Sequence, residues 1–153
     1  MKSLNTLQLD DVMKHIIDFQ GAFPCDQIPK SMKVPYCIIV NTDNANESGD
    51  HWTCIRVEKV KAYFIDSFGR DFEDSTFPKD FRKSVRKLFK DKSIIQNNKL
   101  LQDLTSNACG YYCVYFLDKL SLNYTFKNIV SDFTKDLKFN DLLVLKYFRK
   151  NFL

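Results

Sequence analysis

The fold is decided by the stretch from Gln102 to Leu117, QDLTSNACGYYCVYFL. Ser106 and Asn107 are residue types that cap helix N-termini, and the residues after them stay apolar for about two helical turns. Such a pattern is typical of a helix that is surrounded by core on all sides. The sequence therefore predicts a buried helix that begins near Ala108.

Cys109 falls in the first turn of this predicted helix. Unpaired N–H groups and the positive end of the helix dipole stabilise an anion there, which favours a nucleophilic thiolate near neutral pH. Gly110 has no side chain, so it is expected to leave room for a substrate backbone. The alternative interpretation is that Cys109 is a small buried hydrophobe, as lone cysteines in apolar helices usually are.

The chain contains only two histidines, His15 and His51, so a cysteine–histidine pair must use one of them. His51 follows a polar loop and opens an apolar run that predicts a strand, and a second apolar run ends at Asp66. A hairpin centred between Glu58 and Lys59 would place His51 directly opposite Asp66, with Cβ atoms about 4.5 to 5.5 Å apart. Asp66 would then orient the imidazole toward a thiol, as nucleophilic catalysis requires. His15 is expected to be a solvated helix residue.

Four short motifs follow one another along the chain: His51-Trp52, Phe64-Ile-Asp66-Ser-Phe-Gly69, Gln102 seven residues before the cysteine, and Ala108-Cys-Gly110. Together they resemble the adenain-type cysteine peptidases, the adenovirus maturation protease family, which shares a clan with the SUMO-specific proteases. The segments Cys37-Ile-Ile-Val-Asn-Thr42 and Gly49-Asp-His-Trp52 resemble the adenovirus branch more than the SUMO branch.

The resemblance implies a role for each motif residue. Cys109 would be the nucleophile, His51 its general base and Asp66 the third member of the triad. Gln102 would donate its side-chain amide to an oxyanion hole, with the backbone N–H of Cys109 as the second donor. Adenovirus enzymes generally have glutamate at the position of Asp66, whereas the SUMO branch has aspartate, so this position does not decide the branch.

Trp52 has two interpretations. It is either a large core anchor or an aromatic wall beside His51 that supports the imidazolium by a cation–π contact of about 0.5 to 2 kcal/mol. The resemblance favours the second interpretation, as a residue that supports the site.

The whole chain has the composition of one globular domain. Its 153 residues are 44% hydrophobic and 27% charged, so we expect a single cysteine protease domain spanning residues 1–153. No apolar run approaches the roughly 20 residues of a membrane span. Five cysteines, an odd number, favour reduced thiols in an intracellular setting. No zinc-binding spacing occurs, and we expect no metal, no other cofactor and a monomeric protein.

The predicted fold class is α+β: a mixed, largely antiparallel sheet packed against a central helix that carries Cys109 at its N-terminus, with flanking helices. Residues 36–41 and the two hairpin runs predict three consecutive strands, and 94–96 and 100–102 are short strand candidates. Near the N-terminus, apolar residues from Leu9 to Ile17 predict an amphipathic helix that Gly21 ends, followed by an irregular crossing over 22–34.

A basic helix is predicted over residues 79–92, which contain seven basic and two acidic residues. Its buried stripe is expected to consist of Phe81, Val85, Leu88 and Phe89. The opposite face carries Lys83, Arg86, Lys87 and Lys90. This face is either a solvated surface, which is the usual role of such charge runs, or a surface that contacts DNA phosphates.

By resemblance, the expected function is that of an endopeptidase of a double-stranded DNA virus or virus-like element, such as a virophage or a Maverick/Polinton element. It would cleave capsid precursor polypeptides during particle maturation, in the virion and at an assembly site in the host cytoplasm or nucleus. No cysteine lies between Cys54 and Cys109, where the adenovirus enzyme bonds its activating peptide, so we expect no disulfide-linked peptide cofactor.

Two alternatives stay open. The first is a ubiquitin-like or SUMO-like deconjugating protease of the same clan. The second is a non-catalytic nucleic-acid-binding structural module that uses the basic helix. The presence of Cys109, His51, Asp66 and Gln102 together argues against the second alternative, because a module retained only for binding has no chemical need of all four.

Overall fold

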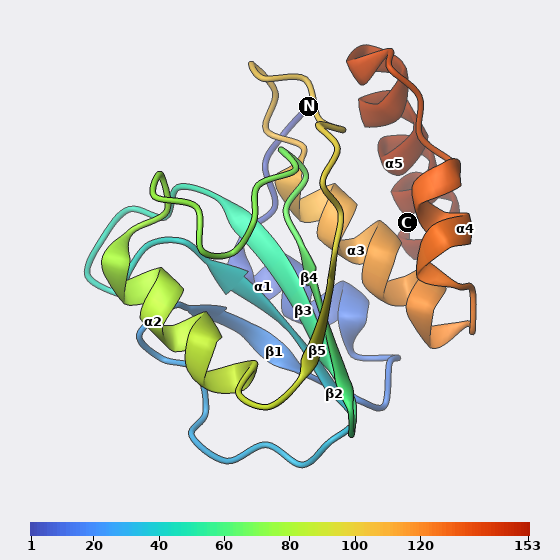
Figure 1. The fold of residues 1–153 in the computed structure, drawn as a ribbon. Helices are drawn as coiled ribbons and strands as arrows, with labels where there is room; N and C mark the ends of the chain where they lie inside the picture. The colour runs from blue at the N-terminus through green and yellow to red at the C-terminus, as the bar shows by residue number, and fades with distance from the viewer.

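The structure, a computed structural model that describes residues 1–153, contains one five-stranded mixed sheet with helices on both faces (Figure 1). The strands are β1 (Phe19–Pro24), β2 (Tyr36–Asn41), β3 (Trp52–Val57), β4 (Lys61–Ile65) and β5 (Ser93–Gln96). They lie in the sheet in chain order. The α+β class and the mixed sheet are confirmed.

The sheet is not largely antiparallel, however. The pairs β2–β3 and β3–β4 are antiparallel, whereas β1–β2 and β4–β5 are parallel. Parallel neighbours need a long connection that returns the chain to the same end of the sheet. Residues 25–35 provide this connection for β1–β2, and a segment that contains a helix provides it for β4–β5.

Helices cover the two faces of the sheet unequally (Figure 1). One face packs against α1 (Thr6–Met13), α3 (Cys109–Ser121), α4 (Phe126–Ser131) and α5 (Leu137–Phe152), and the other packs against α2 (Lys79–Leu88). Side chains alternate between these two cores because successive residues of a strand point to opposite faces. None of the helices is both long and apolar enough to cross a bilayer.

The central helix α3 begins at Cys109, one residue after the predicted start, and its residues from Cys109 to Asp118 are all buried. Neither Ser106 nor Asn107 caps it. The N-cap position belongs to Ala108, which makes no side-chain hydrogen bond to the helix. The first backbone N–H groups of α3 are therefore free to bind another acceptor.

The predicted N-terminal helix is too long. α1 ends at Met13, Ile17 is 95% exposed, and Gly21 lies within β1 instead of ending a helix. The segment expected to cross irregularly thus begins with an edge strand. Its pairing partner is β2, and the Ala22 N–H donates to the Asp10 carboxylate at 2.8 Å. Both contacts join segments that are separated in the sequence. Apolar periodicity within one segment therefore could not predict them.

The hairpin between β3 and β4 is shifted from its predicted register. Lys59 and Val60 form its tip, and the Glu58 N–H donates to the Lys61 carbonyl at 2.8 Å. The turn therefore has two residues at its corner and is centred between Lys59 and Val60 instead of between Glu58 and Lys59.

This register puts Asp66 level with Thr53, so His51 and Asp66 are not directly opposite each other as predicted. The shift is an even number of residues, and side chains alternate with a period of two, so both residues still face the same side. They are diagonal neighbours, at a separation that long side chains can bridge.

Residues 100–102 do not form the predicted strand, and Gln102 lies in a bend. The N–H groups of Leu101 and Gln102 both donate to the Ser67 carbonyl, at 2.9 and 3.1 Å. This contact fixes Gln102 beside the turn that follows β4.

Gly69 is required in that turn for two reasons: its backbone has a φ of +77°, and the space that a side chain would occupy is filled by another segment. A Cβ atom there would lie 2.5 Å from the carbonyl carbon of Lys99 and 2.6 Å from its oxygen. We expect Gly69→Ala to reduce the free energy of unfolding by roughly 3 kcal/mol or more, measured by urea denaturation.

Gly49→Ala is the matched control. Gly49 also has a positive φ, +86°, but its nearest neighbour for a Cβ is 3.4 Å away. Only backbone strain of about 1 to 2 kcal/mol is expected there. Equal losses in the two variants would contradict the assignment of a steric contact at Gly69.

Candidate active site

Cys109, His51 and Gln102 line one cleft of about 740 Å³. The loop between β2 and β3 forms one wall, and the N-terminal segment 3–6 and residues 104–107 contribute others. The structure thus brings together the start of α3, the start of β3 and the segment that precedes α3.

His51 is held by Asp66. The Nε2 atom of His51 lies 2.6 Å from Oδ1 of Asp66, and the two side chains are 7% and 0% exposed. A carboxylate oxygen accepts hydrogen bonds, so Nε2 carries the proton. The other ring nitrogen, Nδ1, is left free to interact with Cys109, which is near enough to raise the pKa of the imidazole.

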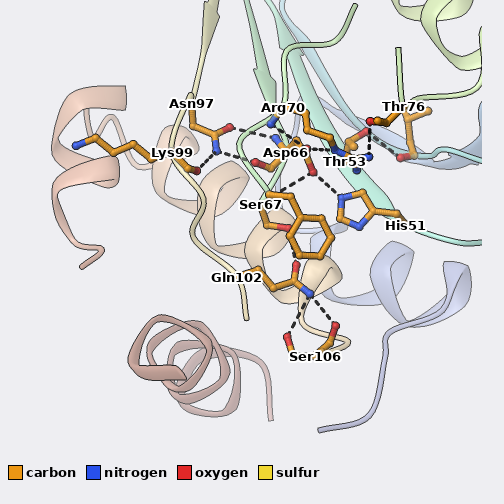
Figure 2. Close-up of polar contacts among 12 residues, drawn as sticks. His51, Thr53, Asp66, Ser67, Arg70, Thr76, Asn97, Lys99, Gln102 and Ser106 are labelled. Carbon is orange, nitrogen blue, oxygen red and sulfur yellow. Dashed lines mark hydrogen bonds and ion pairs between the residues drawn. The ribbon is translucent and has the colours of Figure 1, made fainter. Parts of the chain in front are cut away.

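Asp66 accepts further hydrogen bonds from its own turn (Figure 2). Arg70 donates Nε at 2.8 Å and its backbone N–H at 3.1 Å to Oδ2, and the backbone N–H of Phe68 donates to Oδ1 at 3.3 Å. Asn97 binds the backbone of Asp66 on both sides, with Nδ2 donating to its carbonyl and Oδ1 accepting from its N–H. The carboxylate is therefore both charged and fixed in direction.

The proton equilibria of the pair favour an ion pair. Burial alone would lower the pKa of His51, but the hydrogen bond to Asp66 and the nearby Cys109 raise it to about 9. Burial would likewise raise the pKa of Cys109, but His51 and backbone N–H groups lower it below its usual range. Burial also opposes the ionisation of Asp66, but His51 and Arg70 hold its pKa below normal. These directions describe a thiolate beside an imidazolium, two groups that titrate together.

The thiolate is stabilised by the backbone as well. The backbone N–H groups of Trp52 and Gly110 lie near the Cys109 sulfur and lower the pKa of its thiol. The N–H of Cys109 itself has no backbone acceptor. It is thus available to a substrate oxygen at the position where an oxyanion hole would need a donor.

The Gln102 side chain is buried, and its orientation is determined by its partners (Figure 2). Nε2 donates to the Ser106 carbonyl at 2.9 Å and to its hydroxyl at 3.2 Å, while Oε1 accepts from the Ser67 hydroxyl. The amide cannot be flipped, because a carbonyl oxygen would then face the Ser106 carbonyl. The contact with the Ser106 hydroxyl is the longer of the two, so a substrate oxygen could replace that hydroxyl as the acceptor of one amide hydrogen.

Gly110 does not leave room for substrate as predicted. A Cβ there would lie 3.2 Å from Cβ of Leu4, so the N-terminal segment fills this space. That segment is held by hydrogen bonds from the Trp52 indole to the Leu4 carbonyl and from the Tyr111 hydroxyl to the Lys2 carbonyl. The missing side chain therefore lets Leu4 pack on α3.

The ring that stacks on His51 is Phe68, not Trp52. The two ring centroids are 4.9 Å apart and nearly parallel, at 20°. The Trp52 indole belongs to the core and donates to the Leu4 carbonyl at 2.9 Å. Trp52 supports the site through its backbone N–H and by anchoring the cleft wall, instead of forming the aromatic wall that the resemblance favoured.

His15 lies outside the cleft, and its Nε2 bonds Asp118 of α3 at 2.7 Å. Its side chain is 46% exposed, as expected of a solvated residue, but it lies after the end of α1 instead of within a helix. No three His, Cys, Asp or Glu side chains converge where a metal ion could bind, and all five cysteines are free thiols.

Lys83, Arg86, Lys87 and Lys90 lie on or just after α2, on the face of the sheet opposite α3. None of them lines the cleft. DNA contact by these residues stays a prediction.

Phe68, Arg70 and Asn97 were not predicted as site residues. A signal for the first two was present, because Asp followed by Gly three residues later is a β-turn pattern. The Gly69 N–H does donate to the Asp66 carbonyl, at 2.8 Å, and the turn directs Phe68 and Arg70 back to the carboxylate. Asn97 gave no local signal, since its partner is distant in the chain.

Comparisons with known proteins identify the family and the fold. Residues 19–138 match the model of the family described as adenovirus endoprotease. Crystal structures of the ASFV pS273R protease and of its selenomethionine form align with TM-scores of 0.57 and 0.55. Each is 15% identical to the chain, and the alignment covers 93% of this chain and 66% of that one, so this chain spans slightly less than two thirds of their length. No curated protein sequence matches the chain.

The lowered pKa of Cys109 has a measurable consequence. A thiolate persists to lower pH than in an ordinary thiol, of pKa about 8.5, so Cys109 should still alkylate with iodoacetamide at pH values where an ordinary thiol has become unreactive. Removing the imidazolium raises the thiol pKa, so His51→Gln should shift the pH profile of Cys109 alkylation to higher pH. Mass spectrometry of the labelled peptide gives both rates.

Cys113 is the internal control in the same helix. Burial raises the pKa of Cys113 well above normal, so the native protein should not label there. Equal labelling of Cys109 and Cys113, or an unchanged pH profile in His51→Gln, would contradict the ion pair.

Proposed function

Because the chain belongs to the adenovirus endoprotease family, we propose that it is a cysteine endopeptidase in which Cys109 is the nucleophile, His51 the general base and Asp66 the residue that orients it. The observation that carries this proposal is the Cys109 thiol with its lowered pKa at the start of α3, in one cleft with a histidine held by a buried carboxylate.

In the proposed reaction, the Cys109 thiolate attacks the carbonyl carbon of the scissile peptide bond, and the carbonyl oxygen becomes an oxyanion. The backbone N–H of Cys109 and the side-chain amide of Gln102 donate to that oxygen. The imidazolium of His51 gives its Nδ1 proton to the leaving amine as the tetrahedral intermediate collapses to a thioester. Neutral His51 then accepts a proton from the water that hydrolyses the thioester, and free Cys109 is restored.

The proposed substrates are capsid precursor polypeptides of a double-stranded DNA virus or virus-like element. The work would take place in the virion and at the intracellular assembly site, with the protease acting as a monomer. Support comes from the family, whose members typically cleave beside small residues with a hydrophobic residue upstream. A cleft of about 740 Å³ lined by three separate segments of the chain also suits an extended polypeptide.

The test is incubation of the protein with a cognate capsid precursor and, separately, with a folded ubiquitin-like fusion. Products are identified by mass spectrometry, with Cys109→Ala and a thiol alkylator as controls, and with and without DNA. We expect the precursor to be cut and the fusion to stay intact. Cleavage of the fusion alone would favour a deconjugating protease, and no cleavage of either would favour a binding module.

Gln102 tests the oxyanion hole. Gln102→Ala should lower kcat by about 10² to 10³ with little change in KM, because the donor acts on charge that exists only in the transition state. Steady-state kinetics on a peptide from the cleaved junction measures both constants.

Ser106→Ala is the matched control, since it removes only the 3.2 Å hydroxyl contact of the amide. It should leave kcat close to that of the wild type. A loss that appears mainly as a raised KM in Gln102→Ala would mean that the amide binds ground-state substrate instead.

A further inference from the structure

A second hollow, of about 410 Å³, lies beside α2 and shares no residue with the catalytic cleft. Its apolar lining comes from Phe72, Phe89 and Ile94. Its basic residues are Lys83, Arg86, Lys87 and Lys90. The basic face of α2 is therefore the rim of an apolar depression, instead of a uniformly polar surface.

The positive charges of this rim are mostly unpaired. Arg86 makes two contacts with the Glu73 carboxylate, at 3.0 and 2.8 Å. Lys83, Lys87 and Lys90 have no acidic group within ion-pair distance. Three ammonium groups that have no acidic partner thus surround an apolar floor.

The chain itself shows which chemistry this region accepts. In the segment Asp71-Phe72-Glu73-Asp74, the Phe72 ring packs edge-on against Phe89 with centroids 5.0 Å apart. The next residue, Glu73, pairs with Arg86. An aromatic side chain flanked by carboxylates is therefore already bound at one edge of the hollow, and the remaining space repeats the same combination of apolar floor and cationic rim.

We propose that this hollow docks a partner polypeptide through an acidic segment that contains an aromatic or large aliphatic residue. The apolar side chain would lie on Phe89 and Ile94, and the flanking carboxylates would meet the three lysines. Nucleic acid is the less favoured occupant, because phosphates need the cations but gain nothing from an apolar floor. The site is on the opposite face of the sheet from Cys109, so binding there leaves the cleft open.

The experiment measures the binding of a fluorescein-labelled peptide, EDFEDLE, to the full-length protein by fluorescence anisotropy. Three comparison ligands are used: EDAEDAE, KKFKKLK and a short duplex DNA. The variants are the triple Lys83→Gln, Lys87→Gln, Lys90→Gln protein and Ile94→Thr, whose β-branched replacement suits a strand. Lys127→Gln, Lys135→Gln, Lys146→Gln is the control with the same change of charge on the other side of the molecule.

We expect EDFEDLE to bind the wild type, with the triple variant about tenfold weaker and binding reduced by added salt. Ile94→Thr should bind about fourfold more weakly, from the loss of apolar contact. The control triple variant should bind like the wild type, and EDAEDAE and KKFKKLK should bind weakly or not at all.

Several results would overturn the proposal. One is the absence of EDFEDLE binding to the wild type. Another is equal affinity for EDFEDLE and EDAEDAE, which would show that the apolar floor is not used. A third is tight DNA binding that the triple variant loses and Ile94→Thr keeps, which would assign the surface to nucleic acid. The peptide comparison uses unmodified protein, so it decides the matter even where a variant fails to fold.

Discussion

The buried carboxylate of Asp66 is the constraint on which the site depends. It is fully buried, and a charge in that position is costly unless hydrogen-bond donors surround it. His51, Arg70 and the backbone of the following turn supply those donors, while Asn97 binds the Asp66 backbone. The direction of the imidazole follows from satisfying this one charge.

The sequence was most informative where a residue's role depends on its own segment. Cys109 at the start of an apolar helix and His51 at the start of a strand are local signals, and the structure places both in one cleft. The hairpin register was wrong by two residues, yet His51 still meets Asp66 because strand faces repeat with a period of two. Gly110 illustrates the limit of such reasoning, because a glycine in the sequence indicates that another group packs closely there but does not identify that group.

The remaining features depend on contacts between distant segments. β1 forms because β2 offers a parallel edge, which no local pattern in residues 19–24 can show. Leu4 reaches α3 only in the folded chain. The basic residues of α2 were predicted correctly as a charged face. The apolar floor beside them is made by Phe72 from the loop before α2, Phe89 at the end of α2 and Ile94 of β5. Because these residues are separated in the sequence, only the folded structure shows that they form one surface.

The central claim is that Cys109 and His51 form an ion pair in the free protein, and nitrogen-15 NMR of the histidine rings tests it most directly. Only two histidines have to be assigned. The account predicts that both ring nitrogens of His51 are protonated at neutral pH, that they titrate with a pKa near 9, and that Cys109→Ser lowers this pKa. A neutral His51 that titrates near its ordinary value of about 6.5 and is unaffected by Cys109→Ser would contradict it.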